Sequence, residues 1–197
     1  MNGSSLTELR NHLCRVVVIT GPCGAGKTVL ARILSDRLAW PLLEKDVVKE
    51  MLYDHLGVGD LTWSQKLGAV SYDINWAASG QMARARVSHI VEYPATAASF
   101  LDKAVQKLRS RWSAHVIVLE LTAEAKILRA RFQERIDNGS RHPGHRDGDL
   151  AVERADFSKA PPFGHNVAAD RYHLIRSDHF EAIDVNEVVA ICRGSCG

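Results

Sequence analysis

Eight consecutive residues have the types and spacing needed to bind phosphate. From Gly21 to Thr28 the sequence reads G-P-C-G-A-G-K-T, directly after the apolar run Val16–Ile19. The pattern G-x-x-x-x-G-K-[ST] between a strand and a helix is typical of a phosphate-binding loop, whose backbone N–H groups surround the phosphates. Lys27 would then contact the β- and γ-phosphates and act in catalysis, while Thr28 would bind Mg2+. The candidate binding residues are Gly21, Pro22, Cys23, Gly24, Ala25, Gly26, Lys27, Thr28 and Val29.

Two carboxylates follow expected strands and could act beside the phosphates, because open α/β sheets bind ligands at the carboxyl ends of their strands. Asp46 follows the short run Leu42–Glu44. It could accept a proton from an attacking hydroxyl, help to hold Mg2+, or only cap a helix that starts at Val47. Glu92 could be a ligand of Mg2+ or of its waters, a group that hydrogen-bonds a substrate, or a plain surface acid. Glu120 ends a later strand, and we expect it to be structural.

Arg131 and Arg135 lie four residues apart on an expected helix, beside its apolar side. Paired guanidinium groups suit the phosphate charge of phosphoryl transfer, although a solvated basic helix edge is the alternative. The residues that follow, 138–148, are rich in Gly, His, Arg and Pro and predict an exposed loop. For His142 and His145 we favour a flexible lid, at about 137–150, over a metal site.

The elements that must position these residues alternate between strands and helices. Strands are expected at 15–20, 42–44, 87–93, 115–121 and 172–176, and helices at 4–13, 27–38, 47–56, 62–81, 100–111, 122–137, 150–157 and 184–192. In the helix after the second strand, we expect the apolar side to be Val47, Val48, Met51, Leu52 and Leu56. Thr62 with Gln65, and Thr122, are the expected helix caps. The pattern predicts an α/β fold in three layers, with a five-stranded, mainly parallel sheet.

The composition is that of one globular domain spanning residues 1–197. The net charge of +2 gives no strong field, which disfavours nucleic acid as a partner without excluding it. No apolar run is long enough to cross a membrane, and no signal pattern is visible. The four cysteines form no zinc-type pair of motifs. We therefore expect a cytoplasmic protein whose oligomeric state is open.

Three segments resemble a known family. The loop Gly21–Thr28, the run Leu42–Asp46 with Lys49, and the segment Asp60–Gly68 are similar to the small P-loop kinases that include chloramphenicol phosphotransferase, the zeta-toxin kinases and polynucleotide kinase. Within that group the chain most resembles the AAA-type ATP-binding proteins, and Arg131–His145 resembles their lid region. The resemblance implies a P-loop NTPase fold, ATP and Mg2+ as cofactors, and Asp46 as the base for an acceptor hydroxyl.

The expected function is therefore an ATP-dependent kinase. It would transfer the γ-phosphoryl group to a hydroxyl of a small molecule, such as an antibiotic, a sugar nucleotide or a metabolite. The alternatives are a polynucleotide 5′-hydroxyl kinase and a non-catalytic ATP-binding regulator. The polynucleotide alternative comes second, because the basic residues that could form a nucleic-acid groove are scattered between acids and are not clustered: Arg84, Arg86, Lys103, Lys107, Arg109 and Arg111. Trp63, Tyr72 and Trp76 could line an acceptor pocket or pack in the core.

Overall fold

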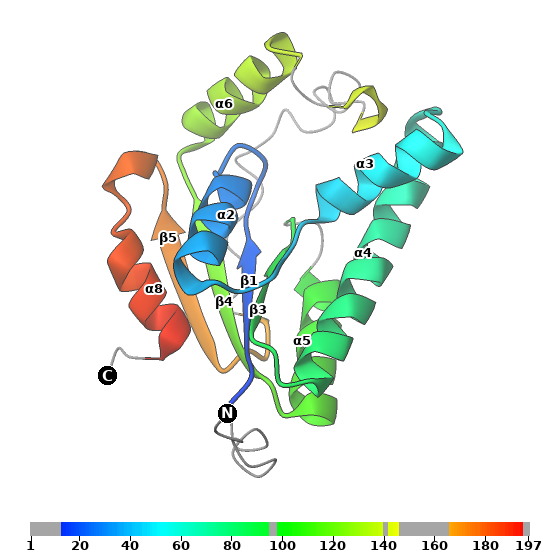
Figure 1. Ribbon diagram of the computed structural model, residues 1–197. Helices are drawn as coiled ribbons and strands as arrows, with labels where there is room; N and C mark the ends of the chain where they lie inside the picture. Colours follow the sequence, from blue (N-terminus) through cyan, green and yellow to red (C-terminus); the bar gives the residue numbers. More distant parts are fainter. Residues whose placement is uncertain (1–12, 95–97, 140–141, 146–165, 195–197) are drawn as a thin grey trace, which may run out of the picture.

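Five parallel strands form one sheet with the order β2-β3-β1-β4-β5 (Figure 1). The computed structural model describes residues 13–94, 98–139, 142–145 and 166–194. The strands are β1 (Arg15–Thr20), β2 (Leu42–Leu43), β3 (His89–Glu92), β4 (His115–Thr122) and β5 (Arg171–Arg176). The helices are α2 (Lys27–Leu38), α3 (Lys45–Leu56), α4 (Leu61–Arg84), α5 (Ala98–Trp112), α6 (Ala125–Asp137) and α8 (Val185–Arg193), with 3-10 turns η1 (Pro143–His145) and η4 (Phe180–Ala182).

Helices cover both faces of the sheet, so the predicted three-layer α/β fold is confirmed. The alternation of side chains along β1 sends Val17 and Ile19 to one face, where they pack with α2 and α8. Val16 and Val18 point to the other face and pack with α5. The central strands are buried on both faces, which is why their sequences are continuous apolar runs.

The helix α3 departs from the predicted pattern. Val47, Met51 and Leu56 are exposed, with Met51 57% accessible, whereas the buried residues of α3 are Lys49 and Tyr53. The expected apolar side is therefore wrong. The reason is that α3 projects away from the sheet and packs on α4, as Figure 1 shows, so it does not cover the central core.

Two helix caps also differ from the prediction. The N-cap of α4 is Asp60, whose carboxylate accepts a hydrogen bond from the Trp63 amide at 2.8 Å, and not Thr62. The helix α6 begins after Glu124, and Asp178 accepts the Glu124 amide hydrogen bond at 2.7 Å in place of a local Thr122 cap. The expected helices at 4–13 and 150–157 lie outside the described residues. Among the described helices none is long and apolar enough to cross a membrane.

Candidate active site at the carboxyl edge of the sheet

The phosphate-binding loop links β1 to α2 at the carboxyl edge of the sheet. Its backbone requires glycine at two positions in particular. Gly24 has a φ of 81° and Gly26 a φ of 88°, both in the left-handed region. A Cβ atom at Gly24 would lie 2.7 Å from the Leu128 carbonyl oxygen, and one at Gly26 would lie 2.7 Å from the Phe180 ring. The chain therefore passes too close to α6 and η4 for any side chain here.

Lys27 is the first residue of α2 and is buried, with only 8% of its surface accessible. A lysine at the surface would extend its ammonium into water. Instead its ammonium folds back over the loop and donates a hydrogen bond to the Pro22 carbonyl at 2.8 Å. Burial lowers the pKa of Lys27, while the charge of Glu92 acts in the opposite direction. The Lys27 ammonium is therefore held inside the phosphate-binding loop predicted from the sequence.

Thr28 and Glu92 meet across the first turn of α2 and the end of β3. The Thr28 hydroxyl donates a hydrogen bond to Glu92 Oε1 at 2.8 Å. Burial raises the pKa of Glu92, and the neighbouring Lys27 charge and the Thr28 hydrogen bond both oppose that rise. One hydroxyl and one carboxylate oxygen beside a phosphate-binding loop fit Mg2+, which takes few protein ligands and fills its shell with phosphate oxygens and water. Glu92 is half-buried and hydrogen-bonded to Thr28, which does not fit a plain surface acid.

Asp46 lies in the first turn of α3, so it is not the helix cap that was considered. The N-cap position is Glu44, which is held instead by Arg32 at 2.8 Å. The Asp46 carboxylate is partly exposed and lies 3.3 Å from the Lys45 ammonium. Its charge acts on both Lys27 and Glu92, raising the pKa of each. The fold thus brings Asp46 to the same edge as the phosphate-binding loop while leaving it open to solvent.

The two arginines of α6 have different surroundings. Arg131 donates hydrogen bonds to the Ser177 carbonyl at 2.9 Å and the Asp178 carbonyl at 3.2 Å, with a longer contact of 3.4 Å to the Gly24 carbonyl. Arg135 lies 4.9 Å above the Phe132 ring, and its charge lowers the pKa of Lys27. Arg131 therefore ties the phosphate-binding loop to the end of β5, whereas Arg135 is the arginine whose field reaches Lys27. Neither lies on the solvated edge considered above.

Within the expected lid, the described residues 142–145 are packed against α3. His145 is 3% accessible and lies 2.8 Å from Glu50 Oε1, through Nε2. His142 stacks on the Tyr53 ring, with centroids 5.2 Å apart, and its Nε2 lies 3.2 Å from Asp54 Oδ1. The prediction of an exposed loop is therefore wrong for these residues. The reason is that α3 presents a polar face, on which histidines can be buried with partners.

Sequence reasoning missed a polar cluster that supports this contact. The buried Ser64 hydroxyl lies 2.9 Å from Lys49 Nζ, 2.7 Å from the Tyr53 hydroxyl and 3.0 Å from the Gly144 carbonyl. The cluster joins α3, α4 and η1. The residue types gave no short motif, and a signal lay only in the spacing of Lys49 and Tyr53, four residues apart on one helix face.

The aromatic residues of α4 have two different environments. Tyr72 and Trp76 are partly buried and pack against the core residue Tyr93, with ring centroids 5.2 Å and 5.9 Å away. Trp63 donates its indole N–H to the Gly57 carbonyl at 2.9 Å, near the start of the helix. Glu120 is buried and accepts a hydrogen bond from the Tyr172 hydroxyl at 3.1 Å, which fits the expected structural role.

A protein family and several solved structures are similar to this chain. The model of a family described as "AAA domain" matches residues 16–155. A solved structure from Chloroflexus aurantiacus J-10-fl, provisionally described as a kinase, is 26% identical with a TM-score of 0.83, and the match covers 93% of this chain and 99% of that one.

Two more distant structures share the fold. Shikimate kinase from Bacteroides thetaiotaomicron is 19% identical with a TM-score of 0.51, over 92% of this chain and 96% of its own. A gluconokinase from Sinorhizobium meliloti 1021 is 15% identical with a TM-score of 0.50, over 92% and 91%. Among curated protein sequences none matches this chain.

Proposed function

The chain belongs to this AAA-domain family of P-loop proteins, and from that premise we propose that it is an ATP-dependent kinase acting on a hydroxyl of a small molecule. The observation that carries the proposal is the meeting of Thr28 with Glu92 beside the buried Lys27, with the Asp46 carboxylate within electrostatic reach of both charges. The kinase descriptions of the similar structures support the reaction class.

Each residue has a separate task in this reaction. The loop amides and Lys27 hold the β- and γ-phosphates, as the motif predicts. Thr28 and Glu92 would hold Mg2+, which supplies charge neutralisation between the β- and γ-phosphates when bound. Asp46 takes the proton of the acceptor hydroxyl as its oxygen bonds to the γ-phosphorus and the bond to the β-phosphate oxygen breaks. Arg135 stabilises the negative charge on the transferred group.

Asp46 is suited to the role of base because it remains partly solvated. Its carboxylate is 42% accessible, so an acceptor hydroxyl can reach it, and it lies 3.3 Å from the Lys45 ammonium. Glu92 is half-buried and already bonded to Thr28, so its position suits a metal ligand better than a proton acceptor. We therefore assign the role of base to Asp46 and the role of metal ligand to Glu92.

We also place the activity in the cytoplasm, where ATP and Mg2+ are available. The described cysteines Cys14, Cys23 and Cys192 are free thiols, which suits a reducing compartment.

The proposal is tested by phosphoryl transfer from γ-labelled ATP into a library of hydroxyl compounds, read by mass spectrometry. Transfer should require a divalent ion, so EDTA should abolish it and weaken nucleotide binding. Stoichiometric ATP binding without transfer to any compound would favour the regulator alternative. Label found only at the 5′ ends of oligonucleotides would instead favour a polynucleotide kinase. Nucleotide affinity that is equal with and without the ion would contradict the roles given to Thr28 and Glu92.

A further inference from the structure

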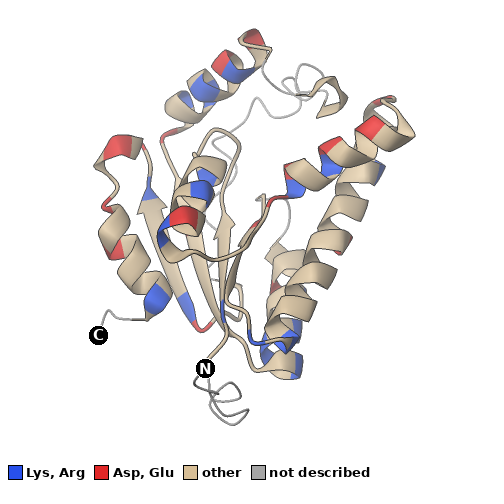
Figure 2. Ribbon diagram, viewed as in Figure 1, with Lys and Arg blue, Asp and Glu red and all other residues tan. Residues whose placement is uncertain are grey.

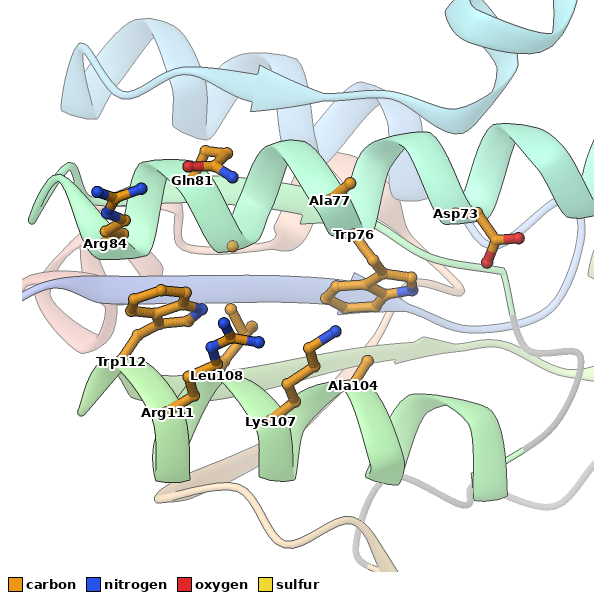
Figure 3. A pocket seen from close by; sticks show the side chains of 11 residues that line it. Asp73, Trp76, Ala77, Gln81, Arg84, Ala104, Lys107, Leu108, Arg111 and Trp112 are labelled. Carbon is orange, nitrogen blue, oxygen red and sulfur yellow. The ribbon is translucent and has the colours of Figure 1, made fainter.

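A pocket of about 390 Å3 lies between α4 and α5, away from the phosphate-binding loop. Figure 3 shows its walls, with the indoles of Trp76 and Trp112 in the space between the two helices. The lining residues come only from α4 and α5, so none belongs to the proposed catalytic machinery. The volume falls within the range of pockets that hold small ligands.

The pocket gathers basic residues that are scattered along the sequence. Arg84 of α4 and Lys107 and Arg111 of α5 all line it, and Asp73 is the one acidic lining residue. Figure 2 shows the blue ribbon segments of Lys and Arg residues gathered where α4 and α5 end, away from the carboxyl edge of the sheet. The pairing of the two helices therefore creates a net positive site that the sequence alone did not predict.

The aromatic walls are held in place by the core and by a neighbouring charge. Trp76 rests against the buried Tyr93, with ring centroids 5.9 Å apart. Arg111 lies 5.0 Å from the centroid of the Trp112 ring. Gly80 leaves room on the α4 side, since a Cβ atom there would lie 3.5 Å from the Trp112 indole nitrogen. Two indoles and three cations thus surround one space whose floor includes Leu108.

We propose that this pocket binds a planar aromatic anion of the mononucleotide class, at a site separate from the nucleotide of the phosphate-binding loop. The indoles offer stacking surfaces for a base, and base–aromatic stacking tolerates any base. Arg84, Lys107 and Arg111 supply the charge that a phosphate requires. Asp73, at the other end of the pocket in Figure 3, would accept hydrogen bonds from sugar hydroxyls. The site goes beyond the proposed kinase reaction.

The test is calorimetric titration with adenosine 5′-monophosphate, after the phosphate-binding loop has been filled with Mg2+ and a non-hydrolysable ATP analogue. We expect one binding event with a Kd below about 1 mM. The double substitution Lys107→Ala/Arg111→Ala should weaken it at least tenfold, by about 1.4 kcal/mol or more. Lys103→Ala, which removes one positive charge from an exposed position of α5 outside the pocket, should change the Kd by less than twofold.

A second variant tests the pocket without any change of charge, in case the double substitution disturbs folding. Gly80→Leu places a side chain toward the pocket and improves helix propensity, so it should fold and block binding. The absence of binding by the wild type would overturn the proposal. So would binding that survives both variants, because the nucleotide would then lie elsewhere. Binding of an oligonucleotide but not of the mononucleotide would also overturn it, in favour of a nucleic-acid surface.

Discussion

The phosphate-binding edge, meaning the loop 21–28 at the carboxyl end of β1, differs in construction from the α3–α4 arm, meaning residues 45–84. The loop at this edge is made of consecutive residues that follow a buried apolar strand, and Lys27 bonds to Pro22 within it. The arm exposes Met51 and Val47 and buries Lys49 together with Ser64. The comparison teaches that phosphate binding is encoded in one short segment. The side of the site where an acceptor would arrive is instead assembled by tertiary contacts between polar groups.

The strongest test of this contrast is Lys27→Ala at the edge. We expect kcat/KM to fall by about a thousandfold or more, because no other group can replace a cation held against the β- and γ-phosphates. Stability should change little, since removing a buried ammonium also removes its desolvation cost. Turnover at saturating ATP and a thermal melt measure the two effects, with the exposed Lys126→Ala as control. Wild-type turnover in Lys27→Ala would refute the assignment of the loop.

Asp46→Asn tests the junction between the edge and the arm. We expect transfer to fall by about a hundredfold to ten-thousandfold while ATP affinity is retained, because asparagine cannot take up the acceptor proton. ATP titration and acceptor turnover should be measured on the same preparation. Asp36→Asn, which makes the same change at an exposed position of α2, should leave both unchanged. A loss of ATP affinity in Asp46→Asn would make Asp46 a metal ligand instead.

Arg131 and Arg135 should separate structure from catalysis within one helix. Arg135→Ala should lower kcat by about a hundredfold and change the KM for ATP less, because its charge would act on the transferred group. Arg131→Ala should instead lower stability by about 2 kcal/mol, since it leaves the Ser177 and Asp178 carbonyls without their cationic donor. Each variant serves as the control for the other in kinetics and urea unfolding. A shared loss of stability would make both arginines structural.

The strands and the phosphate-binding loop could be predicted because their signals are short. The strand β1 and the helix α2 begin and end where the sequence predicts, since apolar runs, glycines and a lysine follow one another without interruption. The position of Glu92 at a strand end was predicted for the same reason. The hydrogen bond between Glu92 and Thr28 joins residues that are 64 positions apart in the sequence, so it could be seen only in the structure.

The buried side of the arm could not be predicted from the sequence, because it depends on which elements pack against α3 and α4. A helix that leaves the sheet does not need an apolar face toward the central core, so the apolar residues of α3 gave a false orientation. The polar cluster joins residues 49, 53, 64 and 144, and the spacing along α3 connects only residues 49 and 53. Asp60 was missed as a cap because Thr62, two residues later, offers a similar motif.

Ser64→Ala tests whether the polar cluster holds the arm together. The hydroxyl contacts Lys49, Tyr53 and the Gly144 carbonyl, so its removal should cost about 1–3 kcal/mol in the free energy of unfolding. Hydrogen exchange should increase first at the amide of residue 145 and along α3. Thr62→Ala, at an exposed position of the same helix, should have no comparable effect. An unchanged unfolding midpoint would mean that the arm is held by other contacts.

The smallest expected effect is a pH dependence where the other end of the arm joins the sheet. His89 begins β3, is fully buried, and lies 2.7 Å from the Ser79 hydroxyl of α4 through Nε2. Burial lowers the pKa of His89 below its ordinary value. A base whose pKa is lower in the folded state favours the unfolded chain once the unfolded form can be protonated.

Stability should therefore be complete above about pH 6.5, the ordinary histidine pKa, and fall as the pH drops from there toward the lowered value. Each unit of lowering corresponds to about 1.4 kcal/mol lost at the acid end. Urea unfolding of the wild type and of His89→Gln across this pH range measures the contribution of His89 to the free energy of unfolding. Glutamine can keep one hydrogen bond but cannot titrate. The stability difference between the two proteins should shrink as the pH falls. A constant difference would mean that His89 contributes packing alone, and that the attachment of α4 to the sheet does not depend on pH in this range.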